Sequence, residues 1–162
     1  MREPVTTIAF AINASLMKTP YDAIKDFTPI TELTSIPIML VVHPSLPVKT
    51  AKDVVQLAKS RKNELNYASS GGGTMPHLAT ELFKSRTGAA LVHIPYKGNG
   101  PAVIDLLAGQ VELMMSGMSS AMPHVKAGSL RALAVMGTTR STALPQVPTV
   151  REAGYKEFEL EG

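Results

Sequence analysis

The 162-residue sequence contains no cysteine and no tryptophan, and aromatic residues make up only 5% of it. Without cysteine the chain cannot form a disulfide, use a thiolate as a nucleophile or bind zinc through sulfur, and its redox compartment stays undecided. The scarcity of aromatic rings argues against the base-stacking surfaces of proteins that bind single-stranded nucleic acids. Binding to nucleic acid is therefore not expected.

Concentrated charge and long apolar runs are missing as well. The net charge is +3, from 16 basic and 13 acidic residues, and the basic residues are scattered except in "KSRK" at 59–62, so no nucleic-acid-binding stripe is formed. No apolar run reaches the roughly 18 residues that a membrane span needs. The first residues, "MREPVTTIAFAINASL", are interrupted by Pro4 and Asn13 and lack the basic start of a signal peptide. We therefore expect this chain to lack a signal peptide.

What is present is a globular composition, with 44% hydrophobic and 18% charged residues. From residue 36 onward, runs with the pattern of strands alternate with runs with the pattern of helices. The expected strands are 36–42, 64–68, 90–94, 111–115 and 131–137, and the expected helices are 50–60, with Thr50 as its N-cap, 74–85, 100–108 and 121–127. This alternation predicts an α/β fold with a mostly parallel sheet flanked by helices.

Three of the expected helices carry a proline in the first turn, at Pro76, Pro101 and Pro123. Proline loses no helical hydrogen bond there, because the N–H groups of the first turn have no partner within the helix. Each of these helices follows a strand, and the carboxyl ends of parallel strands meet at one edge of the sheet. Three helix N-termini, each partly positive, would then converge on one crevice, which predicts an anionic ligand.

The stretch Ser69–Thr74, "SSGGGT", joins an expected strand to an expected helix. Its glycines allow close backbone approach, and the hydroxyl groups of Ser69, Ser70 and Thr74 could add hydrogen bonds to a carboxylate or phosphate. A flexible connector is an equally open interpretation of this stretch alone. The phosphate-binding P-loop does not match, because no lysine follows the glycines, and the dinucleotide fingerprint fails because Pro76 stands where a third glycine is required.

Patterns for catalysis or metal binding are not found. There is no Gly-x-Ser-x-Gly elbow and no His/Asp pair spaced to orient Ser69 or Ser70. No spacing of histidines or carboxylates suggests a metal. His77, in the first turn after the glycines, is the one histidine placed to meet a ligand, although a hydrogen bond that fixes the loop is the favoured role, and His93 is expected to be packed within its strand. We predict no catalytic residue, no metal and no cofactor.

The two other strand-to-helix crossings supply further candidates. Tyr96 could point into the crevice, whereas Lys97 is more simply a solvated lysine. Ser116 and Gly117 lie at the third crossing. The methionines of that crossing are expected to fill the core and its rim.

Four blocks of the sequence resemble the tripartite tricarboxylate transporter substrate-binding family, to which the Bug-type periplasmic receptors belong. They are "YASSGGGTMPHLATELFKSRTG", "LVHIPYKGNGPAVIDLLAGQVELM", "SAMPHVKAGSLRALAV" and "LPQVPTVREAGY". The resemblance covers nearly the whole chain from about residue 11, in ordered blocks.

The resemblance implies one lobe of a two-lobed periplasmic solute receptor with a type II periplasmic-binding-protein-like fold. Such a receptor closes on a small carboxylate and delivers it to the permease subunits of a membrane transporter. The family's second-lobe ligand loop aligns with the glycine stretch, so the resemblance assigns ligand binding to Ser69, Ser70, Gly71, Gly72, Gly73 and Thr74. Tyr96 and the Ser116–Gly117 turn match neighbouring family segments.

The family's signal peptide and its first-strand ligand loop, rich in proline and glycine, are not found in this sequence. We therefore expect a fragment in which residues 1–35 are a remnant of the first lobe and the crossover, 36–137 are the second lobe, and 138–162 return toward the first lobe. Remnants without their partner surface would expose apolar strand edges, so we expect self-association. A ligand held by one lobe should bind weakly.

Two other classes of function stay open on the sequence. One is a small α/β enzyme that acts on a carboxylated or phosphorylated substrate at the same loop, and the other is a ligand-sensing module without transport. The identity of the acid is open too, because a loop of backbone N–H groups suits dicarboxylates, tricarboxylates, amino acids and aromatic acids alike.

Overall fold

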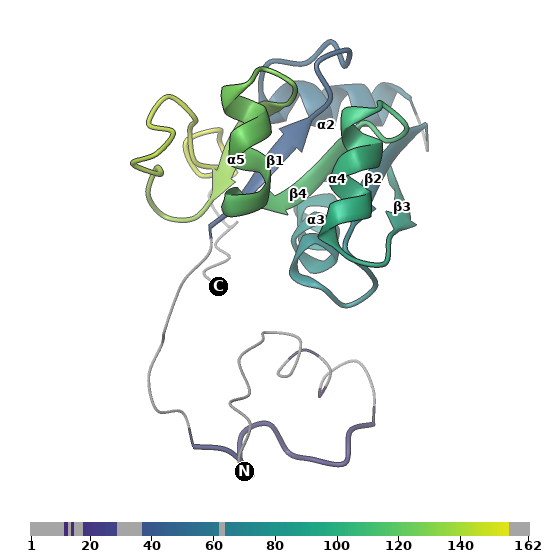
Figure 1. The fold of residues 1–162 in the computed structure, drawn as a ribbon, viewed down its shortest axis with the longest axis vertical. Helices are drawn as coiled ribbons and strands as arrows, with labels where there is room; N and C mark the ends of the chain where they lie inside the picture. The colour runs from purple at the N-terminus through teal and green to yellow at the C-terminus, as the bar shows by residue number, and fades with distance from the viewer. Residues whose placement is uncertain (1–11, 13, 15–17, 29–36, 62–63, 156–162) are drawn as a thin grey trace.

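The computed structural model describes residues 12, 14, 18–28, 37–61 and 64–155. Strands and helices alternate along its main body (Figure 1). In chain order they are β1 (Ile38–Val42), α2 (Ala51–Ser60), β2 (Leu65–Ser69), α3 (Met75–Thr87), β3 (Leu91–Pro95), α4 (Asn99–Leu107), β4 (Leu113–Gly117), α5 (Met118–Lys126) and β5 (Arg131–Met136). The predicted alternation is confirmed. Residues 18–28 form a turn that lies apart from this body in Figure 1, and most of the segment 1–35 falls outside the described residues.

The five strands form one sheet in the order β3-β2-β4-β1-β5. β2 is parallel to both of its neighbours, β3 and β4, whereas β1 is antiparallel to β4 and to β5. Four strands therefore point in one direction, and β1 alone runs against them. The predicted α/β fold class is confirmed, with the refinement that the sheet is mixed. The alternation of strands and helices could not reveal the direction of β1, because no helix described by the structure precedes it to form a crossover.

The helices cover both faces of the sheet. On one face, Leu40 and Met115 pack with residues of α2 and α3 in one hydrophobic cluster. On the other face, Met39 and Met114 pack with residues of α4 and α5 in a second cluster. Along β1 the side chains alternate between the two faces, as the pleat requires, whereas a register shift in β5 leaves the consecutive residues Leu133 and Ala134 in the first cluster. Two apolar layers thus fix the sheet from both sides and position the loops at its edges.

The segment after β5 packs on that strand. Thr149 forms an isolated parallel bridge with Val135, the Val135 N–H donates to Pro148 O (2.9 Å), and the Val150 N–H donates to Val135 O (3.0 Å). Val147 and Val150 are buried. We expected residues 138–162 to leave apolar strand edges exposed, and this is wrong for the described residues 144–155, which cover the β5 edge. Self-association stays a prediction.

Helix α2 begins with a complete capping box. The Asp53 N–H donates to Thr50 Oγ1 (3.2 Å), and the Thr50 N–H donates to Asp53 Oδ2 (2.9 Å). The hydrogen bond from the Lys49 N–H, followed by those from Thr50, lowers the pKa of the Asp53 carboxyl. The predicted N-cap is confirmed.

Within the described residues, no helix has both the length and the apolar character that crossing a bilayer would take.

We expect Thr50→Ala to lower the free energy of unfolding by about 1 kcal/mol, because the first turn of α2 loses a side-chain acceptor. Urea denaturation followed by far-ultraviolet circular dichroism measures this change. Gln56→Ala, on an exposed position of the same helix, is the control and should change stability by less than about 0.5 kcal/mol. Equal effects of the two substitutions would show that the cap contributes nothing of its own.

Candidate functional site

The loops that follow β2, β3 and β4 lie along one edge of the sheet, because these strands are parallel. β2 and β4 are neighbours, yet the helix after β2 (α3) packs on one face and the helix after β4 (α5) packs on the other. Adjacent parallel strands whose helices leave to opposite faces mark the switch point at which open α/β sheets bind ligands. The pairing of β2 with β4 ends at Ala68 and Met114. The glycine loop Ser69–Thr74 begins directly after this point. The expected turn at Ser116–Gly117 is wrong, because these residues are the last two of β4 and pair with Met39 and Ile38 of β1.

Three helix N-termini lie at this edge, as the sequence predicted, since α3, α4 and α5 follow β2, β3 and β4. None of the three has a hydrogen bond from a side-chain cap, in contrast to α2. Their first-turn N–H groups need other acceptors, and one of them is already engaged, since the Met118 N–H of α5 donates to Pro37 O (2.9 Å). Thr74 is the N-cap residue of α3, but its side chain does not cap the helix, because its Oγ1 donates to Gly71 O (2.7 Å) instead. The expected first-turn position of Pro123 is also wrong, since α5 begins at Met118 and Pro123 lies inside it.

Several polar groups of the glycine loop are used to hold its shape. Ser69 Oγ accepts from the Gly71 N–H (3.2 Å), and Thr74 Oγ1 donates to Gly71 O. The Gly73 N–H donates to His77 Nδ1 (3.1 Å), which is the loop-fixing hydrogen bond favoured for this histidine. Ser69 is fully buried. The loop conformation is therefore stabilised by the side chains of Ser69, Thr74 and His77.

Two residues of the loop keep donors that are not engaged. Within the part of the chain that the structure describes, the Ser70 N–H, the Ser70 hydroxyl and the Gly72 N–H have no hydrogen-bond partner. Gly72 is exposed, and no atom lies within 4 Å of the point where a Cβ would stand. These donors lie at the N-terminus of α3, which is itself partly positive. An anion at this edge would meet them first.

The β3–α4 loop is bonded to the glycine loop. The Tyr96 N–H donates to Ser69 O (3.0 Å), and the Gly98 N–H donates to Ser70 O (3.2 Å). The Tyr96 hydroxyl donates to Asp105 Oδ2 on α4 (2.7 Å), and burial together with this bond raises the pKa of Tyr96 to about 12. The structure thus brings Tyr96 next to the loop through its backbone, while its hydroxyl is held by α4.

Ser116 and Gly117 lie at the end of β4. Ser116 is fully buried, and its Oγ lies 3.4 Å from Gly117 O. Gly117 is the N-cap of α5. These residues lie at the predicted edge, but the Ser116 side chain is buried there, and the first N–H of α5, that of Met118, already donates to Pro37 O (2.9 Å).

Beside the loop lies an aromatic stack that the sequence did not predict as a unit. The Tyr67 and His93 rings stack at 4.8 Å between centroids, and the His93 and His77 rings stack at 4.2 Å. His93 Nε2 lies 2.6 Å from Ser69 Oγ. Burial, and then the charge of His77, lower the pKa of His93. The expectation that His93 is packed is confirmed.

A signal for the Ser69–His93 contact did exist in the strand pattern. β2 and β3 are parallel, with Tyr67 opposite His93 and Ser69 opposite Pro95. Since side chains alternate between faces, Tyr67 and Ser69 lie on the same face as His93. The separation of 24 residues along the chain hides this contact from any search for local motifs.

The Ser69–His93 pair has the residue types of a nucleophile and its base, but not their setting. Ser69 is fully buried, so a substrate cannot reach its hydroxyl. The nearby Glu81 carboxylate is occupied, because it accepts from the Tyr67 hydroxyl (2.6 Å) and from Lys84 Nζ (2.7 Å). A triad also needs a group that orients the histidine. The pair is therefore a structural contact.

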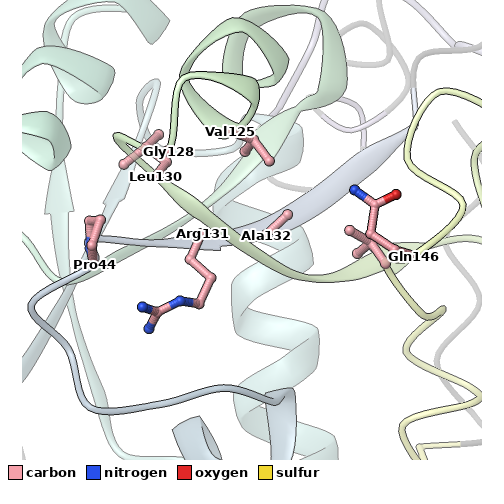
Figure 2. A pocket seen from close by; sticks show the side chains of 8 residues that line it. Pro44, Val125, Gly128, Leu130, Arg131, Ala132 and Gln146 are labelled. Carbon is pink, nitrogen blue, oxygen red and sulfur yellow. The ribbon is translucent and has the colours of Figure 1, made fainter.

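No group of three or more potential metal ligands gathers among the residues described. A pocket of about 270 Å³ is present at the opposite edge of the sheet, lined by Pro44, Val125, Gly128, Leu130, Arg131, Ala132, Gln146 and Val147 (Figure 2). Arg131 is the first residue of β5, and the other end of this strand lies at the glycine-loop edge. The pocket is therefore at the far end of the strands from the glycine loop. Arg131 Nη1 already donates to Val48 O (2.8 Å), and the pocket is smaller than the ~300 Å³ at which ligand sites usually begin.

Comparison with known proteins gives one consistent result. A family model described as tripartite tricarboxylate transporter family receptor matches residues 5–162. The chain is 42% identical over 149 residues to protein BugT of Bordetella pertussis, a match that covers 91% of this chain and 46% of that protein. The chain spans about half the length of the curated relatives it matches.

Solved structures agree with this result. The chain is 39% identical to an R. palustris protein solved with adipate, with a TM-score of 0.81 over 87% of this chain and 47% of that chain. It is 30% identical to MatC from Rhodopseudomonas palustris with bound malate, with a TM-score of 0.83 over 94% of this chain and 51% of that chain.

Two adjacent glycines test the geometry of the loop. Gly71 has a φ of +132°, and a Cβ there would lie 3.5 Å from Tyr96 O. We expect Gly71→Ala to lower the free energy of unfolding by about 1–3 kcal/mol, because L-residues rarely adopt this conformation. Gly72→Ala, which places its methyl group in open space, should change it by less than about 0.5 kcal/mol. Urea denaturation of both variants measures the difference, and equal stabilities would contradict the described loop.

Proposed function

This chain belongs to the tripartite tricarboxylate transporter family of receptors, and we propose that it binds a small organic carboxylate at the glycine loop without transforming it. The observation that carries this proposal is the pair of unengaged donor residues, Ser70 and Gly72, at the switch point of the sheet. Backbone N–H groups at a helix N-terminus bind carboxylates and phosphates. The relatives solved with adipate and malate support a carboxylate as the ligand class.

The loop residues have different roles in this proposal. Ser70 and Gly72 donate to the ligand, together with first-turn N–H groups of α3. Ser69, Thr74 and His77 hold these donors in place through the bonds within the loop. Tyr96 supports Ser69 from the β3–α4 loop, and the backbone of Ser116–Gly117 forms the opposite side of the switch point.

The finer parts of the function extend to the whole receptor. We propose that residues 36–137 form one ligand-binding lobe, that residues 1–35 and 138–162 connect it to a second lobe, and that the acid is delivered to the permease subunits of a membrane transporter. Periplasmic location follows the relatives, one of which is a periplasmic binding protein, BugD. A site built by one lobe alone leaves the ligand open to water, so its affinity should be low.

An enzyme at the same loop is the second candidate, and two observations disfavour it. The family is one of receptors rather than enzymes. The one Ser–His pair of the loop has a fully buried serine. A ligand-sensing module without transport would use the same donors, and a functional link to a permease separates it from a receptor.

We expect isothermal titration calorimetry to detect weak binding of malate or adipate to this chain. Ser70→Ala should weaken it about tenfold or more, because a hydrogen bond to a charged group is worth about 1.5–3 kcal/mol. Ser85→Ala, on an exposed position of α3, is the matched control and should leave affinity unchanged.

Several results would contradict the proposal. Binding of phosphates or nucleotides in place of organic acids would assign the loop to another ligand class. Consumption of the acid during the titration would favour the enzyme. Equal losses in Ser70→Ala and Ser85→Ala would remove Ser70 from the site.

A further inference from the structure

Two histidines hold the glycine loop from two sides. His93 on β3 contacts Ser69 Oγ through Nε2 (2.6 Å), and the same Oγ accepts from the Gly71 N–H. His77 on α3 accepts from the Gly73 N–H at Nδ1 (3.1 Å). The planes of the two imidazole rings differ by 17° at 4.2 Å between centroids. Both anchors of the loop therefore belong to one stack.

The two hydrogen bonds that anchor the loop differ in the protonation state that they require of the histidine. A backbone N–H can only donate, so the bond to Gly73 requires His77 Nδ1 to be unprotonated. The Ser69–His93 contact has no such requirement, because a serine hydroxyl can donate to Nε2 or accept from it. Histidine is the side chain that changes charge between about pH 5 and 8. A proton on His77 Nδ1 breaks the Gly73 anchor and leaves the Gly71 anchor intact.

The groups that face His77 come from three elements. Tyr67 on β2 and His93 on β3 form the stack with it, and Glu81 and Lys84 lie further along α3. Glu81 and Lys84 form an ion pair with each other (2.7 Å). β4 contributes only uncharged residues, Leu113 and Met115, to the buried cluster on this face.

Protonation of His93, the middle ring of the stack, is disfavoured. Burial, and then the positive charge of His77, lower the pKa of His93. Two charged imidazoles at this stacking distance would repel each other.

We propose that His77 is a proton-sensitive positioning residue of the glycine loop. Neutral His77 holds Gly73, and protonated His77 releases it. Gly73 directly follows Gly72 in the chain, and the Gly72 N–H is one of the unengaged donors. Release of Gly73 from His77 therefore changes the position of the donor that an anion would meet. This device rests on the proposed function for its use, because the shape of the loop matters only when the loop holds a ligand.

A nuclear magnetic resonance titration of the ¹⁵N-labelled chain from about pH 8 to about pH 5 tests the proposal without any ligand. We expect the Gly73 amide to shift with the same midpoint as the His77 ring. The Gly71 amide, still bonded to Ser69, should move much less. His77→Asn keeps an acceptor atom near the Nδ1 position and cannot titrate, so it should abolish the Gly73 response. His124→Asn, a histidine of α5, should leave the response unchanged.

A Gly73 amide that does not move while His77 titrates would overturn the proposal, and so would a full response in His77→Asn. If that variant does not fold, the titration of the wild-type chain still decides. The bond from the Gly73 N–H requires an unprotonated Nδ1 on His77 at about pH 8, so a proton found on Nδ1 at that pH would contradict the bond. Failure of every acid to bind in calorimetry would remove the proposed function, whereas the titration would still report on the loop.

Discussion

The parallel pairing of β2 with β4 is the constraint on which the site depends. These strands are neighbours, but the chain leaves β2 toward one face of the sheet and leaves β4 toward the other. The ladder between them therefore ends at Ala68 and Met114, and the two loops diverge. The turn out of β2 is sharp, and Gly71 and Gly73 make it possible with φ values of +132° and +74°. The strand order by itself therefore accounts for a glycine loop at this place, whatever the loop binds.

The polar groups of the loop divide into two sets, and the division explains how a flexible sequence can hold a fixed shape. Hydroxyl and imidazole groups of Ser69, Thr74 and His77 bond to Gly71 and Gly73. Such bonds satisfy backbone groups that the turn takes out of the ladder. The donors of Ser70 and Gly72 are the remainder. A loop that used every donor internally would be rigid but could not bind, and one that used none would lose its shape in the absence of a ligand.

The periodicity of apolar residues predicted the order of the strands and helices, because buried residues recur at a different spacing in a pleated strand and in a helix. The direction of β1 could not be predicted, since hydrophobic pattern carries no direction. The start of α5 was placed too late because Pro123 was interpreted as a first-turn residue, whereas it lies inside the helix. The glycine loop itself was recognised from its residues. The Ser69–His93 contact was missed because it depends on the register of two strands, which local spacing does not contain.

The charges around the loop bear on the carboxylate binding that we propose for it. The nearest ion pair, Glu81 with Lys84, is internal to α3, and hydrogen bonds from Lys84 and Tyr67 outweigh burial to lower the pKa of Glu81. This pair offers little net charge to a ligand. In the proposed function, the attraction for an anion would then come from N–H groups and helix N-termini, which act within the first turn. A short-range field of this kind recognises a carboxylate group wherever it is carried. Selection among acids must therefore come from the shape of the space around the rest of the molecule rather than from the glycine loop.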